Sequence, residues 1–220
     1  MKSIRVDIVS DVVCPWCIVG LRQLQVATDA TGIDVDVHWH PFELNPQMPE
    51  DGQNLQEHMC TKYGTTVEQS NDARQRLTAI GKELDFSFQF GEQSRMVNTF
   101  KAHQLLHWAK LQGQEHTLKL ALFSAYFTEQ QDINDSGVLL DVVESLDMNR
   151  SDAMAVLNEG RHEDDVRREQ QLWTSRGITG VPAMVFNEKY LVTGAQGYEN
   201  YTEILKQITR ENETEVAASE

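Results

Sequence analysis

The sequence has no long apolar run and a shortage of positive charge. None of its apolar runs approaches the ~20 consecutive residues that a membrane-spanning helix needs. Its 19 lysines and arginines stand against 34 aspartates and glutamates, which gives a formal net charge of −15. A surface of that sign repels phosphates and anionic lipids, so we expect neither a nucleic acid nor a membrane as a partner.

Cysteine is scarce as well, and a secretory signal is not evident. The segment MKSIRVDIVSD lacks the apolar core and small-residue cleavage site of a signal peptide, so we expect a cytoplasmic protein. Three cysteines in 220 residues are too few for a disulfide scaffold, and a reducing compartment keeps thiols reduced. A CxxC pair in such a protein is more often catalytic or metal-binding than structural.

The first 45 residues predict a βαβ unit. Residues 4–9 and 33–40 alternate apolar and polar side chains, which is typical of strands with one buried face. Between them, apolar residues recur at helical spacing until Gly32, which marks the end of a helix. Two strands joined by a helix are expected to be parallel, with a right-handed crossover.

The rest of the chain predicts a helical block and then a ββα unit. Residues 46–177 carry apolar positions at spacings of three and four, which indicates four to six amphipathic helices. The segments VPAMVFN and KYLVTG then predict a hairpin that turns at Asn187-Glu188. A helix over about 198–209 is expected to follow it.

This order predicts an α/β protein with an inserted domain. Residues 1–45 and 178–210 would form one sheet-containing domain, and residues 46–177 a helical domain inserted between its halves. Residues 211–220 are polar and predict a flexible tail. The inserted block would lie as a lid over the edge of the sheet, where ligand clefts are common.

The motif Cys14-Pro15-Trp16-Cys17 lies where the first strand gives way to the helix. The free N–H groups and positive dipole end of a helix favour an anion there, so the pKa of Cys14 is expected to be lowered. Pro15 suits the first helical turn, where its missing N–H costs nothing. The motif therefore predicts a redox dithiol, with Cys14 as the exposed attacking thiol and Cys17 as the more buried resolving thiol.

Two other interpretations of the motif stay open. A structural zinc site would need four ligands, usually from two such pairs, and the chain has no second pair. The residues left to complete it are Cys60, His58, His38 and His40. Alternatively, the two cysteines are small apolar residues of the core. Cys60 itself lies in a helical pattern and is interpreted as a buried small side chain.

A proline far downstream supports the redox interpretation. Pro182 opens a strand after Gly180 and Val181, a context that favours a cis peptide bond. Such a bond facing a dithiol would expose the backbone of Val181 for pairing with an extended substrate. A trans proline that merely starts the strand is the structural alternative.

Five segments, taken in order, resemble the DsbA-like branch of the thioredoxin superfamily, and in particular its FrnE-type oxidoreductases. They are DVVCPWCIVG, HPFELNP, NTFKAHQLLHWA, LFSAYFTEQQDIND and GITGVPAMVFNEKYLVTGAQ. This branch is related to 2-hydroxychromene-2-carboxylate isomerase and kappa-class glutathione transferases. The resemblance spans about residues 4–207 and implies a thioredoxin fold with an inserted helical domain and dithiol–disulfide chemistry.

The resemblance also implies roles for individual residues. It makes Cys14 the nucleophile, Cys17 the resolving thiol and Pro182 the cis-proline of the catalytic site. It implies no bound metal or cofactor, only a redox-active Cys14–Cys17 disulfide, with glutathione as a candidate co-substrate. The substrate-binding positions that it implies are Trp16, Val181, Phe42, Asn45, Asn98 and Gln196.

The sequence thus predicts a thiol–disulfide oxidoreductase that acts on protein or small-molecule disulfides, as a monomer or homodimer. The alternative is a glutathione-dependent isomerase or transferase acting on a small aromatic substrate, which would need no resolving cysteine. A zinc-binding or holdase module is the non-enzymatic alternative. A further pair, His103 and His107, is spaced four apart on a helix but lacks a third ligand, so it is interpreted as core or surface.

Overall fold

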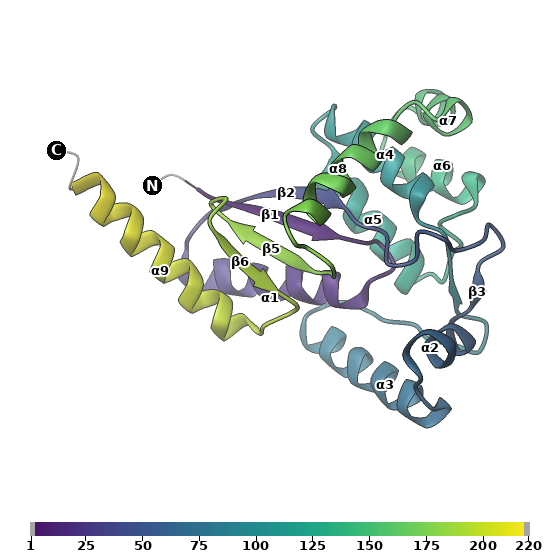
Figure 1. The fold of residues 1–220 in the computed structure, drawn as a ribbon, viewed down its shortest axis with the longest axis horizontal. Helices are drawn as coiled ribbons and strands as arrows, with labels where there is room; N and C mark the ends of the chain where they lie inside the picture. The colour runs from purple at the N-terminus through teal and green to yellow at the C-terminus, as the bar shows by residue number, and fades with distance from the viewer. Residues whose placement is uncertain (1–2, 218–220) are drawn as a thin grey trace.

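The computed structural model describes residues 3–217, and its first elements form the predicted βαβ unit (Figure 1). These are β1 (Ile4–Ser10), α1 (Pro15–Thr31) and β2 (Val35–Pro41), with β1 and β2 paired in parallel along their whole length. Helix α1 ends at Gly32, whose φ of 65° is left-handed and whose N–H donates to the Thr28 carbonyl. Glycine adopts that conformation without steric cost, which is why the helix ends there.

The predicted hairpin completes the sheet. Strands β5 (Ala183–Phe186) and β6 (Tyr190–Thr193) are antiparallel, and the four-stranded sheet has the order β2-β1-β5-β6. Asn187 and Glu188 have positive φ values of 48° and 59°, as a tight two-residue turn requires. The predicted hairpin and its turn are therefore confirmed.

The last helix is longer than the sequence predicts. Helix α9 (Tyr198–Ala217) continues beyond Thr209 and takes in residues 211–217 of the predicted flexible tail. Polar contacts support this extension, because Glu211 accepts hydrogen bonds from the Tyr190 hydroxyl and, at 3.0 Å, from the Gln207 amide. Residues 218–220 lie outside the described part of the chain.

Between β2 and β5 the chain is mostly helical, as predicted, with seven helices where the sequence predicts four to six. Its helices are α2 (Leu55–Tyr63), α3 (Val67–Glu83), α4 (Phe100–Lys110), α5 (Glu115–Phe127), α6 (Ser136–Ser145), α7 (Arg150–Glu159) and α8 (Glu163–Ser175). Two short strands, β3 (Gln53–Asn54) and β4 (Arg95–Met96), form a small ribbon that the sequence did not predict. No helix within residues 3–217 is long and apolar enough to cross a membrane.

Helix α8 is the helix that the sequence pattern did not reveal. It is mostly polar, and only Val166 and Trp173 along it are buried. These two residues are seven positions apart and therefore lie on one face of the helix. Its position is nevertheless important, because seven residues after its last residue, Ser175, the chain reaches Pro182.

The two faces of the sheet have different coverings. Helices α1 and α9 lie side by side on one face, and α8 lies on the other (Figure 1). Ile4, Val6 and Ile8 of β1 belong to the same apolar cluster as residues of α1 and α9. Val9, which points to the opposite face, packs with Trp173 of α8. The period of two in β1 therefore separates two layers of packing.

Helix α5 connects the inserted helices to the sheet. Its Leu118 and Leu122 are fully buried in the core of the helical domain. Phe123 and Phe127 of the same helix pack into the core between the sheet and α1. Val12, in the loop before Cys14, is buried in the core of the helical domain in turn. The loop that carries the cysteines is thus held between both cores.

Candidate active site

The CPWC motif forms the first turn of α1. Cys14 is the N-cap residue with an extended backbone, and Pro15 occupies the first helical position. The turn is closed by two backbone hydrogen bonds, from Cys14 N to the Asp11 carbonyl at 3.2 Å and from Cys17 N to the Cys14 carbonyl at 3.1 Å. The predicted placement of the dithiol at a strand–helix junction is confirmed.

The exposure of the thiols differs from the prediction. Cys14 is only 2% exposed and Cys17 is fully buried, so the expectation of an exposed Cys14 is wrong in this conformation. The exposed residue of the motif is Trp16, at 44%. All three cysteines, Cys60 included, are free thiols.

Cys14 contacts the segment that contains Val181 and Pro182, which lies 167 residues further along the chain. The Cys14 thiol donates to the carbonyl oxygen of Val181 at a Sγ–O distance of 3.7 Å. The Val181-Pro182 peptide bond is cis, as the sequence predicts. Pro182 is buried and its own carbonyl accepts a hydrogen bond from Gly194 N at 2.8 Å, at the end of the β5–β6 hairpin.

The two thiols lie close enough for the ionisation of one to affect the ionisation of the other. Burial opposes ionisation of Cys17, but the hydrogen bond from Cys14 and the positive charge of Lys119 outweigh it and lower the pKa of Cys17. The hydrogen bond to Cys17, together with burial, raises the pKa of Cys14. The lowered pKa expected for Cys14 from its place at the helix start is thus opposed by burial and by the neighbouring thiol, and its role as the nucleophile stays a prediction.

Lys119 is a buried charged residue whose positive charge lowers the pKa of Cys17, and the sequence patterns did not reveal it. It is 1% exposed on α5, and its Nζ donates to the Ser10 carbonyl at 3.4 Å. The same Nζ lies 5.3 Å from the ring centres of Trp39 and Phe123, which is within range for cation–π attraction. Burial lowers the pKa of Lys119. The available signal was a single lysine at an apolar position of the segment EHTLKLALF.

Two more buried polar groups support the loop that carries the cysteines. The carboxylate of Asp11 accepts from Leu44 N at 2.7 Å and lies 3.3 Å from Nε2 of His103 on α4. His103 is thus a core residue, which is one of the two placements, core or surface, expected from the sequence. Glu115 lines a small cavity together with Lys119, and burial raises its pKa to about 7.

Two of the residues that the resemblance implies for the cleft make local hydrogen bonds. Asn45 accepts a hydrogen bond from Lys62 Nζ at 2.6 Å. The Asn98 amide donates to the Met48 carbonyl at 2.8 Å. The Asn45 amide thereby links the end of the first sheet segment to α2, the Asn98 amide links two segments of the inserted domain, and their role toward a substrate stays a prediction.

The other implied cleft residues are divided between core and surface. Phe42 is half-buried and packs on the cluster that contains Trp173, on the α8 face of the sheet. Gln196 is exposed, and its amide donates to the Thr193 carbonyl at 2.5 Å. Of this set, Val181 is the residue that contacts a thiol through a hydrogen bond in the described part of the chain.

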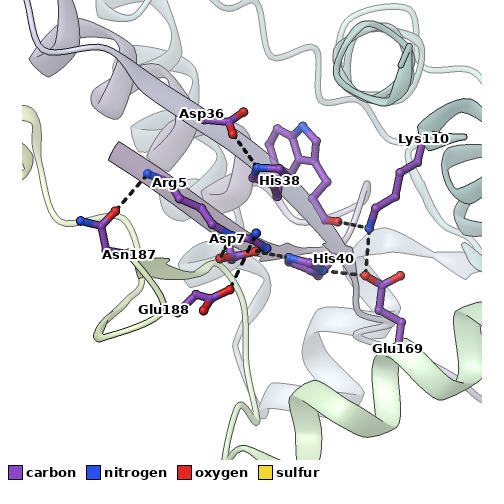
Figure 2. A network of polar contacts seen from close by, with 10 residues as sticks. Arg5, Asp7, Asp36, His38, His40, Lys110, Glu169, Asn187 and Glu188 are labelled. Carbon is purple, nitrogen blue, oxygen red and sulfur yellow. Dashed lines mark hydrogen bonds and ion pairs between the residues drawn. The ribbon is translucent and has the colours of Figure 1, made fainter. Parts of the chain in front are cut away.

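A second polar cluster lies on the α8 face of the sheet (Figure 2). His40 joins two carboxylates, with 2.7 Å from Nε2 to Asp7 and 2.6 Å from Nδ1 to Glu169. The Arg5 guanidinium forms an ion pair with the Asp7 carboxylate at 2.7 Å, and the Lys110 ammonium lies 3.1 Å from the Glu169 carboxylate. Burial opposes both ionisations, but these partners hold the pKa of Asp7 well below its usual range and raise the pKa of His40.

The cluster contains His38 and His40, two of the residues that could have completed a zinc site with the cysteines. His40 is buried because α8 covers it, whereas His38 is more exposed and pairs with Asp36 at 2.8 Å. Both imidazoles are engaged by carboxylates. Within residues 3–217, no group of three metal-ligating side chains includes a cysteine.

Comparison with known proteins agrees with the fold. A model of the DSBA-like thioredoxin domain matches residues 5–206. A probable DsbA oxidoreductase of Streptomyces coelicolor, SCO1869, is similar at 31% identity and a TM-score of 0.88, over 93% of this chain and 89% of its own. The uncharacterized protein YwbO of Bacillus subtilis is 26% identical over 201 residues, covering 89% of this chain and 92% of YwbO.

A third similar protein is the cytosolic disulfide reductase DsbM of Pseudomonas aeruginosa, solved with GSH. It shares the fold at 18% identity and a TM-score of 0.58, over 94% of this chain and 99% of its own. The family model spans nearly the whole sheet domain and the inserted helices. The chain therefore belongs to the DsbA-like thioredoxin family.

Proposed function

We propose that the protein is a cytoplasmic thiol–disulfide oxidoreductase whose reacting group is the Cys14–Cys17 dithiol. The observation that carries the proposal is the 3.7 Å contact between Cys14 Sγ and the Val181 carbonyl. It brings a thiol against the backbone segment with which an extended substrate would pair. The family membership supports oxidoreductase chemistry in general.

The first step is attack by Cys14 on a substrate disulfide. The thiolate, not the thiol, is the nucleophile, so Cys14 first loses its proton to solvent. Its sulfur then attacks, a bond forms between Cys14 and one substrate sulfur, and the substrate S–S bond breaks. The other substrate sulfur leaves as a thiolate and takes up a proton from solvent.

The second step releases the substrate. Cys17 loses its proton to solvent, helped by the charge of Lys119, and attacks Cys14 Sγ. The mixed disulfide breaks, and the second substrate sulfur departs as a thiolate that takes up a proton from solvent, so two electrons have passed from the dithiol to the substrate. Run backwards, the same steps oxidise a dithiol substrate. The direction depends on the reduction potential of the pair relative to the compartment.

The substrates fitted to this site are disulfides of proteins or small molecules. An extended segment would pair with the backbone of Val181 beside Pro182, and Trp16 would provide an exposed apolar surface next to the thiols. Burial of Cys14 means that substrate approach must move the neighbouring side chains. No bound cofactor is needed for these steps, and glutathione would act as the second thiol substrate.

The test uses single cysteine variants in an insulin reduction assay and in exchange with glutathione disulfide. Cys14→Ser should abolish turnover, and Cys17→Ser should accumulate a mixed disulfide with the substrate. Cys60→Ser is the matched control and should retain full activity. Full activity of Cys14→Ser would overturn the proposal, whereas glutathione-dependent turnover of an aromatic substrate that survives Cys17→Ser would establish the isomerase or transferase alternative.

A further inference from the structure

A group of imidazoles and carboxylates lies apart from the dithiol, where the start of α8 meets α4. It consists of His107 on α4, His162 at the N-cap of α8 and Asp165 in the first turn of α8. We propose that these three side chains bind a divalent transition-metal ion, Zn²⁺ in particular. This site goes beyond the proposed function and does not depend on it.

The distances within the group match a tetrahedral ion. One potential ligand atom from each residue lies within 4.8 Å of the others. His162 Nδ1 is 3.1 Å from Asp165 Oδ2, and His107 Nε2 is 3.6 Å from the same oxygen. Bonds of about 2.0–2.1 Å in a tetrahedral zinc site place neighbouring ligand atoms about 3.3 Å apart. The side chains therefore need only small adjustments to share one ion.

The chemistry of the donors fits as well. Two imidazole nitrogens and one carboxylate oxygen are a set that suits Zn²⁺, while Mg²⁺ and Ca²⁺ prefer oxygen ligands. The three side chains are 20%, 16% and 32% exposed, so an aquated ion can reach them and keep a water as its fourth ligand. Glu163 and Asp164 add negative charge in the first turn of α8, which offsets the positive end of the helix.

A carboxylate lies next to the second ring nitrogen of His107. His107 Nδ1 is buried without a hydrogen-bond partner among residues 3–217, and the nearest carboxylate oxygen in an ion pair with it is Glu169 Oε2 at 3.8 Å. Metal-binding histidines commonly turn their second nitrogen toward such a carboxylate. Glu169 is itself held by His40 and Lys110 (Figure 2), so its position is fixed from behind.

An ion pair with Arg168 orients the Asp165 carboxylate. Arg168 pairs with its Oδ1, which leaves Oδ2 as the atom that faces both imidazoles. The arrangement explains why one oxygen lies close to two histidine nitrogens at once. With an ion present, that oxygen and the two nitrogens become ligands of the same centre.

Binding would brace α8 against α4. Helix α8 leads into the loop that carries Val181, and α4 carries His103, which contacts Asp11 before the dithiol. An ion that binds the folded chain and not the unfolded chain stabilises the fold by mass action. The role assigned to the metal is therefore a structural brace between two helices that flank the dithiol.

The test measures Zn²⁺ binding in a variant without cysteines, because the dithiol itself could bind the ion. The background is the triple variant Cys14→Ser, Cys17→Ser and Cys60→Ser, stripped of metal with a chelator. Calorimetric titration with ZnCl₂ should show one equivalent bound, and thermal unfolding should shift upward. The imidazole NMR signals of His107 and His162 should move as the ion is added.

Two ligand variants and one control decide the outcome. In the cysteine-free background, His162→Gln and His107→Gln should each lower the affinity at least about tenfold. His38→Gln removes another partly exposed, carboxylate-paired imidazole and should leave the affinity unchanged. Circular dichroism of the metal-free variants checks that they fold, and the His162 side chain makes no cap hydrogen bond that its loss would remove. Absence of stoichiometric binding, or equal affinities in all four proteins, would overturn the site.

Discussion

The buried lysine next to the dithiol provides the sharpest prediction. Lys119→Met replaces the ammonium with an apolar side chain of similar length, which removes the charge and largely keeps the packing. We expect the pKa of the first thiol ionisation of the Cys14–Cys17 pair to rise, because Lys119 stabilises the thiolate. A neighbouring opposite charge typically shifts a pKa by about 2 units, which corresponds to about 2–3 kcal/mol.

The same change has a consequence for the redox equilibrium. Removing the charge destabilises the reduced, ionised form relative to the disulfide form, so the reduction potential should fall. A cost of about 2–3 kcal/mol corresponds to about 40–60 mV for a two-electron couple. The oxidised protein should be equally or more stable, because no carboxylate within residues 3–217 lies within 4.0 Å of the Lys119 ammonium to compensate its burial.

The assay follows the ultraviolet absorbance of the thiolate against pH in a Cys60→Ser background, where only the pair contributes. Lys110→Met is the control, since Lys110 pairs with Glu169 on the other face of the sheet. Its titration curve should coincide with that of the parent. A Lys119→Met curve that also coincides with the parent would refute the reasoning, and would mean that Lys119 is uncharged in the fold.

Two further predictions concern stability. His40→Ala should cost about 3 kcal/mol in urea unfolding, because the carboxylates of Asp7 and Glu169 lose the imidazolium between them. Since the folded pKa of His40 is raised, this loss should be largest below about pH 6.5 and shrink as the pH rises through that raised pKa; a loss independent of pH would contradict the ion-pair explanation. Gly81→Ala should cost about 1–3 kcal/mol, because the new Cβ would lie 2.5 Å from the Phe86 carbonyl oxygen, and an unchanged unfolding midpoint would show that the turn yields freely.

Much of the fold follows from local patterns. Three features depend only on residues that are close in sequence. They are the period of two in residues 33–40, the glycine that ends α1 and the Asn187-Glu188 turn. Apolar residues at spacings of three and four predict most of the inserted helices. Helix α8 is the exception, because its stability depends on Trp173 packing on the sheet and on ion pairs that no local pattern shows.

The candidate site divides in the same way. The sequence by itself determined the dithiol at a helix start and the proline segment opposite it, since both are short motifs with a mechanism of their own. Only the tertiary structure decided the electrostatics. In the folded chain Cys14 is buried, and Lys119 lies near Cys17 although the two are about a hundred residues apart in sequence. His107, His162 and Asp165 likewise lie together only in the fold. The cause is that charges act through space, and the distances that set their strength exist only once the chain has folded.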